Sequence, residues 1–450
     1  MLLKYQTYLF KGGHSRSVRA KRNITLSFVI KLVSIGLNLV LVPMTIGFIS
    51  PGQYGIWLTL SSFVGWFSVM DIGFGNGLRN RFAESMANGR PDEARAYVST
   101  TYAILAALSL MMFFVFLALQ PHLSWSRMLN APAAQEQVLS RLAFFVAMFF
   151  CLQFALQPVN TMVVANQQSG KAAMFTLVGG IFSVLSVYIM TRMRTGGLMA
   201  IGIVLSAAPV LSLIVASAWF YRKEYRQFLP SLAFVRKSYV RGLTGVGLKF
   251  FIIQIAAVIF FQTDSFVIAH VFGPEEVTTF NVAYKLFSVV IMGFSLVVAP
   301  LWSAFTEAHT KGDMAWIRNV MGRLRRLWGL ASLLVLAMVA VSPLIFRLWL
   351  GEAVSVPMGL SIMMGVYMVV YMWQTMHVYL LNGIGRIQLQ VYLVLVCGTL
   401  NIPLSIFLGR IIGVSGVALS NTLLFLFMGW LFSVQVKKMF TGDAKGIWAK

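Results

Sequence analysis

Charge is scarce in this 450-residue sequence. Asp, Glu, Lys and Arg together make up 11% of it, whereas a soluble protein carries about 25%. The sequence is also 58% hydrophobic, which is more apolar surface than a soluble domain has interior to bury. Several apolar runs approach or exceed about 18 residues, the length that spans a bilayer as a helix. The sequence therefore predicts an all-α polytopic membrane protein.

Acidic residues and cysteines are rarer still. The 13 Asp and Glu stand against 36 Lys and Arg, for a net charge of +23. Such an excess can indicate nucleic-acid binding, but the basic residues lie in short loops between apolar runs. The positive-inside bias explains that placement better, so we expect no nucleic-acid partner. Cys151 and Cys397 lie inside apolar runs without metal-ligand spacing, and we interpret both as buried packing residues.

Motifs of catalysis are also missing. The sequence contains no GxxxxGK[ST] nucleotide loop and no HExxH-like histidine spacing. Its loops are short, which excludes the large catalytic loop that a glycan polymerase would need. We therefore predict no enzymatic activity, no metal, and no cofactor other than a coupling Na⁺ or H⁺.

The apolar runs predict twelve membrane spans. They cover about 24–50, 52–72, 97–119, 140–165, 172–191, 197–220, 244–270, 277–305, 327–349, 356–382, 388–409 and 411–436. Of the 36 Lys and Arg, 27 fall in loops on one side, six on the other and three within spans. This asymmetry predicts that both termini are cytoplasmic.

The sequence also shows signs of an internal repeat. Pro51 and Pro274 open the second and eighth spans at an offset of 223, and three further pairs share that offset: Phe82 and Phe305, Glu84 and Glu307, Gly89 and Gly312. Six spans return the chain to its starting side, so the repeats would be parallel six-helix bundles. We predict bundles at 1–220 and 244–450, joined by a basic cytoplasmic linker at 221–243. This linker either lies along lipid headgroups or is an ordinary connection, and the sequence leaves both open.

Three stretches resemble a known family. They are SFVIKLVSIGLNLVLVPMTIGFISPGQYGIW at 27–57, MDIGFGNGLRNRFAE at 70–84 and FQTDSFVIAHVFGPEEV at 261–277. They are similar to spans of the polysaccharide transporter family, which contains the O-antigen and other lipid-linked oligosaccharide flippases. This family belongs to a superfamily with the multidrug exporters. The resemblance implies two six-helix bundles around a central cavity that opens alternately to each side of the membrane.

Asp264 is the acidic residue that lies well inside a predicted span, about 9 Å from its external end. A charge at the bilayer centre costs at least about 2.5–3.5 kcal/mol and therefore usually faces water or a partner. Three roles are open: binding a coupling proton or Na⁺, pairing with a lysine of the cavity, or a local hydrogen bond with Gln262 or Thr263 that fixes helix packing.

Lys31, Lys249 and Lys285 are the cations within spans, and the resemblance implies that their helices line the cavity. Ammonium groups there would bind an anionic pyrophosphate. The alternative is that their long side chains reach the interface, most readily for Lys31 and Lys249. Arg79 is a further candidate at the cytoplasmic mouth, where an ordinary topology signal is the alternative. The polar candidates for the sugar are Gln254, Gln262 and Asn281.

Together these features predict a flippase of the bacterial inner membrane. It would move an undecaprenyl-pyrophosphate-linked oligosaccharide, an O-antigen or exopolysaccharide repeat unit, by alternating access while the lipid tail stays among the membrane lipids. A glycan polymerase and glycosyltransferases of the same pathway are the expected partners. The rival hypotheses are a cation-coupled multidrug exporter, which the three lysines disfavour, and a non-transporting scaffold of a glycan assembly complex.

Overall fold

The computed structural model describes residues 15–67, 71, 73–166, 168–244, 258 and 262–449. The regular secondary structure of these residues is helical, without a strand. Nine of the described segments are long and apolar enough to cross a membrane: 29–48, 91–122, 133–165, 170–193, 198–222, 274–298, 314–350, 388–412 and 415–441. The protein is therefore a multi-pass membrane protein. Each of the nine overlaps a predicted span.

Of the three remaining predicted spans, two coincide with helices and the third is described only at its end. Helices α3 (Pro51–Phe67) and α16 (Met358–Ile384) occupy the places of two of them. The span predicted at 244–270 falls largely outside the described residues, which include its end as a helix at 262–272. The count of twelve thus stays a prediction.

Contacts group the chain into two units. Unit 1 comprises residues 1–48, 67–124 and 134–251, and unit 2 comprises 49–66, 125–133 and 252–450. Helix α3 groups with the helices of the second half of the chain. The predicted bundle ranges of 1–220 and 244–450 remain predictions.

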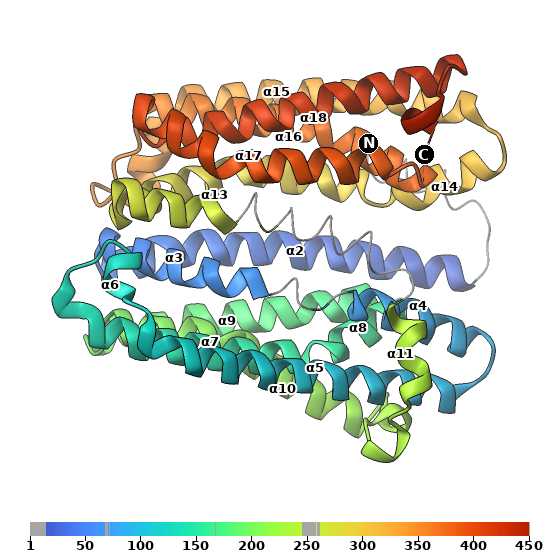
Figure 1. The fold of residues 1–450 in the computed structure, drawn as a ribbon, viewed down its shortest axis with the longest axis horizontal. Coiled ribbons are helices and arrows are strands. Elements are labelled where there is room, and N and C mark those ends of the chain that lie inside the picture. Colours follow the sequence, from blue (N-terminus) through green and yellow to red (C-terminus); the bar gives the residue numbers. More distant parts are fainter. Residues whose placement is uncertain are drawn as a thin grey trace. The chain divides into compact units, whose positions relative to one another are not determined.

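Unit 1 is built from long helices and short ones that cover their ends. Its helices are α2 (Ser15–Phe48), α4 (Phe74–Ala87), α5 (Pro91–Leu119), α7 (Glu136–Leu156), α8 (Pro158–Ala165), α9 (Ser169–Met193), α10 (Leu198–Arg222) and α11 (Lys237–Thr244). Helix α2 packs against α9, α10 packs against α7 and α9, and α5 packs against α7 and α4 (Figure 1).

Unit 2 contains α3, the helix at 262–272 and the C-terminal helices. These are α13 (Pro274–Val298), α14 (Leu301–Thr310), α15 (Met314–Leu350), α16, α17 (Gln388–Ile412) and α18 (Ser415–Thr441). Helix α16 packs against α13, α15 and α18, and α17 packs against α18 (Figure 1). Large apolar side chains such as Leu330 and Leu333 on α15 are exposed at 66% and 63%. In a membrane protein such side chains face lipid.

Prolines set several of the helix boundaries. Two predicted spans, 140–165 and 277–305, each divide at a proline, because proline lacks the N–H that would continue the hydrogen-bond ladder. Pro158 begins α8 directly after α7, and Pro300 is the N-cap of α14 directly after α13.

The paired residues of the predicted repeat occupy matching positions. Pro51 and Pro274 begin α3 and α13, and Phe82 and Phe305 are both fully buried. Gly89 and Gly312 have φ angles of 67° and 72°, a backbone conformation that glycine adopts without strain. The offset of 223 therefore relates residues with the same structural roles.

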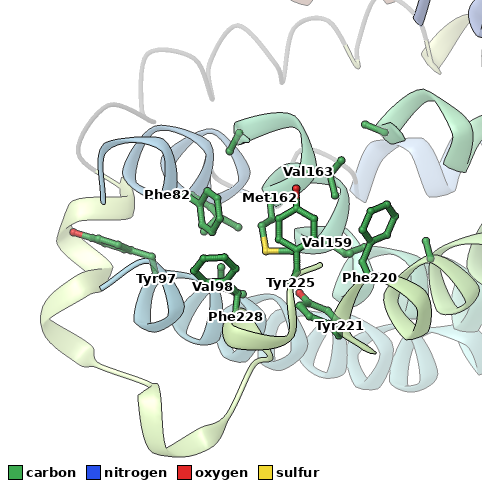
Figure 2. Close-up of a cluster of buried hydrophobic side chains, with 14 of the residues drawn as sticks. Phe82, Tyr97, Val98, Val159, Met162, Val163, Phe220, Tyr221, Tyr225 and Phe228 are labelled. Atoms are coloured by element: carbon green, nitrogen blue, oxygen red, sulfur yellow. The ribbon is translucent and has the colours of Figure 1, made fainter. Parts of the chain in front are cut away.

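A cluster of buried aromatic and aliphatic side chains forms the core at one end of unit 1. Figure 2 shows Phe82 of α4, Val159 and Met162 of α8, and Tyr225 and Phe228 of the predicted linker converging on it. The rings of Phe82 and Phe228 meet edge to face with centroids 5.1 Å apart, a favourable aromatic geometry. The linker is therefore a folded part of unit 1.

Candidate functional site

A polar cluster lies inside unit 2, around three consecutive residues of the helix at 262–272. Thr263, Asp264 and Ser265 are exposed at 2%, 8% and 8%. Successive side chains of an α-helix point about 100° apart. The three residues therefore reach different neighbouring helices.

Asp264 belongs to a network of buried amides. Its Oδ2 accepts a hydrogen bond of 2.6 Å from Nδ2 of Asn421 on α18. Oδ1 of Asn421 accepts from Nδ2 of Asn401 on α17 at 2.7 Å, and Oδ1 of Asn401 accepts from the Thr263 hydroxyl at 3.3 Å. The chain of hydrogen bonds thus returns to the residue beside Asp264. It ties α17 and α18 to the helix at 262–272.

The other carboxylate oxygen of Asp264 is buried and, among the described residues, has no hydrogen-bond partner. The observed partner of the carboxylate is Asn421 rather than Gln262 or Thr263, the local partners considered from the sequence.

Ser265 connects the same helix to α13 and α3. Its hydroxyl oxygen accepts from Nδ2 of Asn281 at 3.3 Å, and Asn281 also donates to the Val277 carbonyl at 2.9 Å. The Ser265 carbonyl accepts from the Thr59 hydroxyl at 3.5 Å. Asn281 is half-buried, and its amide nitrogen is engaged within unit 2.

Lys285 lies one helical turn beyond Asn281 on α13 and turns toward α3. Its ammonium group donates a hydrogen bond of 2.8 Å to the phenol oxygen of Tyr54 and lies 5.5 Å from the centre of the same ring. Tyr54 is 4% exposed, and Lys285 is half-buried. Within the part of the chain that the structure describes, no carboxylate forms an ion pair with Lys285.

Backbone contacts bring α3 and α13 close together at this point. The Thr278 hydroxyl of α13 donates to the Pro51 carbonyl of α3 at 2.6 Å. A Cβ atom added at Gly55 would lie 1.6 Å from the Pro274 carbonyl oxygen. Glycine at this position therefore permits the approach that places Tyr54 beside Lys285.

The remaining predicted site residues are distributed as follows. Lys31 on α2 and Arg79 on α4 are exposed and belong to unit 1, whereas Gln262 is half-buried at the start of the helix that carries Asp264. Lys249 and Gln254 lie outside the described residues. The structure thus brings Gln262, Asp264, Asn281 and Lys285 into one unit.

Sequence reasoning missed Tyr54, Asn401 and Asn421. The two asparagines are uncharged, so they do not interrupt an apolar span as an acid does, although each is an amide in an otherwise lipid-compatible helix. Tyr54 resembles any tyrosine of a membrane helix until α13 is placed beside it. No group of three or more His, Cys, Asp or Glu able to hold a metal ion occurs among the described residues.

Comparison with known proteins places the chain in a family. Residues 20–305 match the model of the family described as polysaccharide biosynthesis protein. The chain belongs to the polysaccharide biosynthesis protein family. The match includes every site residue predicted from the sequence, and it ends shortly after α13.

Two proteins similar to this chain carry names of transport or export. A Salmonella typhi protein named for O-antigen transport is 24% identical over 67% of this chain and 68% of its own length. A Yersinia pseudotuberculosis protein named for O-antigen export is 20% identical over 80% of this chain and 82% of its own length.

The fold of this family member is similar to that of a solved membrane transporter. A multidrug resistance MATE family transporter of the MOP superfamily, solved in an inward-facing conformation, superimposes with a TM-score of 0.76. The alignment covers 93% of this chain and 98% of that transporter, at 14% sequence identity. At that identity the likeness establishes the fold alone.

Proposed function

We propose that the protein is a flippase for an undecaprenyl-pyrophosphate-linked oligosaccharide in the bacterial inner membrane. Membership of the polysaccharide biosynthesis protein family supports this function, as do the relatives named for O-antigen transport and export. The fold supports the same function, because the similar solved structure is a membrane transporter. Alternating access would carry the hydrophilic head across while the lipid tail remains in the bilayer.

The observation that carries the proposal is the environment of Lys285. Its ammonium group lies in a membrane helix and contacts the neutral phenol of Tyr54. Among the described residues no carboxylate neutralises it. A cation held in a membrane without an anionic partner has its charge available for an anionic substrate. A pyrophosphate concentrates negative charge and offers several acceptor oxygens to a donor of this kind.

Transport of cationic drugs fits this environment less well. A cationic substrate would be repelled by Lys285, since like charges brought together within a few Å in a partly dehydrated site are destabilising. Lys31, Lys249 and Arg79 remain candidates from the sequence for binding the anionic head of the substrate. Gln254, Gln262 and Asn281 remain candidates for the sugar.

Asp264 is the proposed coupling residue for H⁺ or Na⁺. One of its oxygens is held by Asn421, whereas the other is buried without a hydrogen-bond partner among the described residues. A buried acceptor left unpaired is costly. Binding of a proton or a cation would remove that cost, so the gradient of one of these ions would act on a defined group.

Reconstitution into liposomes tests the substrate class. Purified protein would be supplied with a fluorescent undecaprenyl-pyrophosphate glycan in one experiment and with a cationic dye in a second. We expect protein-dependent movement of the glycan lipid to the opposite leaflet and no dye transport. Dye transport without glycan movement would instead identify a drug exporter, and movement of neither compound would favour a scaffold.

A further inference from the structure

The basic segment, residues 221–243, carries a second feature that the proposed transport function does not use. One side of it is anchored in unit 1. Tyr225 and Phe228 are exposed at 1% and 2% and point into the buried cluster of Figure 2. The Tyr225 hydroxyl accepts from Nδ2 of Asn166 at 2.9 Å and donates to Oε1 of Gln168 at 3.0 Å. The segment therefore has a fixed orientation.

The middle of the basic segment is clamped along α5. Three hydrogen bonds hold it: Arg95 Nε donates to the Leu229 carbonyl at 3.1 Å, the Ser231 N–H donates to the Ser99 hydroxyl at 3.2 Å, and the Arg236 N–H donates to the Thr100 hydroxyl at 3.1 Å. The Arg95 guanidinium also lies 4.1 Å from the centre of the Phe234 ring. The depth of residues 229–236 in the membrane is thus set by the depth of α5.

That depth is the level of the lipid headgroups. Helix α5 has 29 residues and is therefore about 44 Å long, which exceeds a hydrocarbon core of about 30 Å. Its residues 96–119 carry no charge, which is more than the roughly 20 residues needed to cross that core. Ser99 and Thr100 lie in the first two turns of this stretch, after Arg95. Residues 229–236, which are hydrogen-bonded to this part of α5, therefore lie at the boundary between the hydrocarbon core and the headgroups.

The exposed side chains of the segment combine two leucines, Leu229 and Leu232, with several cations. Leu232 is 87% exposed, although the turn that carries it is firmly held. Five basic residues of the segment are exposed: Arg222, Lys223, Arg226, Arg236 and Lys237. Close by, Trp219 on α10 is 60% exposed beneath the Lys223 ammonium, 4.0 Å from its ring centre. Tryptophan is enriched at this level of membrane proteins.

The one acidic residue of the segment does not offset these cations. Glu224 forms an ion pair with Lys171 of α9 and accepts a second hydrogen bond from Gln168 at 2.6 Å. Partial burial raises the pKa of Glu224, but these two hydrogen bonds and the Lys171 charge outweigh it and hold the pKa below its usual range. The carboxylate is thus ionised and matched within unit 1, and the five cations remain unmatched by the segment itself.

We propose that the basic segment is a binding surface for anionic phospholipids on the side of the membrane predicted to be cytoplasmic. Leu232 enters the boundary between headgroups and acyl chains, and the five cations bind the phosphates around it. Polybasic segments beside membrane helices bind anionic lipid in this way. The arrangement would fix the height of α5 and α10 in the bilayer. It does not depend on what the protein transports.

A fluorophore at position 232 tests the surface directly. Leu232→Cys would be labelled in a Cys151→Ser, Cys397→Ala background and placed in nanodiscs of phosphatidylcholine, with or without phosphatidylglycerol. We expect quenching by nitroxide-bearing lipids, protection from iodide in water, and stronger lipid quenching with phosphatidylglycerol. The matched control is Asn88→Cys, which is exposed in the turn between α4 and α5. Its label should be quenched by iodide.

The proposal is wrong if the label at 232 is as accessible to iodide as the label at 88, or if neither quencher reaches it, which would indicate a protein partner.

The cations are tested by replacing all five with glutamine and counting phosphatidylglycerol molecules retained per protein by native mass spectrometry. We expect a severalfold loss of retained phosphatidylglycerol. The matched control replaces five exposed cations of unit 2: Lys311, Arg325, Arg326, Lys437 and Lys445. Equal loss in both variants would contradict a specific surface, and the labelled Leu232→Cys protein still decides if the glutamine variant does not fold.

Discussion

Lys285 on α13 donates a hydrogen bond of 2.8 Å to the phenol oxygen of Tyr54 on α3. The two residues are separated by 231 positions in the sequence. The contact joins a membrane cation to an uncharged partner in unit 2, and it connects α13 to α3.

Tyr54→Phe removes the acceptor of this hydrogen bond and keeps the ring. We expect a loss of about 1.5 kcal/mol of stability, at the low end for a hydrogen bond to a charged group because Lys285 is partly exposed. Glycan-lipid movement should slow as well, since the ammonium loses its positioning contact. Thermal unfolding in detergent and the liposome assay measure the two effects. Tyr392→Phe, whose residue is 50% exposed on α17, is the matched control and should change neither.

Asn421→Ala removes the donor that holds Asp264. It leaves a buried carboxylate oxygen unpaired, which costs about 1–3 kcal/mol or more for a charged group. The double variant with Asp264→Ala should lose less than the sum of the single losses, because the two residues share one interaction. Chemical denaturation of the four proteins provides the cycle. Additive losses would show that the network contributes nothing as a unit.

Gly55→Ala tests the close approach of α3 and α13. The added Cβ would overlap the Pro274 carbonyl oxygen, 1.6 Å away, so the helices must separate. We expect a lower unfolding temperature and loss of the Tyr54–Lys285 contact. Gly293→Ala on α13 is the control, because a Cβ there meets nothing within 4 Å. It should be neutral or slightly stabilising, since alanine is the better helix former. Equal unfolding temperatures for the two variants would contradict the packing described.

Phe228→Ala tests whether the basic segment is anchored in unit 1. Removing this fully buried ring should cost about 3–5 kcal/mol. Leu232→Ala, four residues later in an 87% exposed position, should leave stability in detergent almost unchanged. Limited proteolysis in detergent gives a second measurement, in which Phe228→Ala should expose residues 229–236 to cleavage. Similar stability of both variants would mean that the segment is not part of the core.

Much of the fold could be predicted from the sequence because a membrane imposes one dominant rule. Apolar runs long enough to cross it form helices, since the backbone has no other partner there. The helices of unit 2 illustrate the limit of that rule. The run at 277–305 was predicted as one span, yet Pro300 divides it into α13 and α14. A hydrophobicity pattern does not show where a helix ends inside an apolar stretch.

The candidate site was predictable only in part. Asp264 stands out in the sequence because charge is rare and costly in a span. Its partners Asn401 and Asn421 do not, since amides are uncharged and their contacts depend on how α17 and α18 pack. Tyr54 is recognised as the partner of Lys285 only once two distant helices are side by side. A charged residue in a membrane span can be recognised from the sequence, whereas its hydrogen-bond partner is known only from the fold.

The rate at which wild-type protein and Lys285→Gln move an undecaprenyl-pyrophosphate glycan across liposomes tests the central claim most directly. Lys285→Gln keeps a hydrogen-bond donor but removes the charge. We predict that Lys285→Gln lowers this rate about tenfold or more. Lys285→Arg should retain part of the wild-type rate. Lys311→Gln, an exposed control in the same unit, should keep the full rate. Wild-type rates in correctly folded Lys285→Gln would contradict an anionic substrate held by this cation.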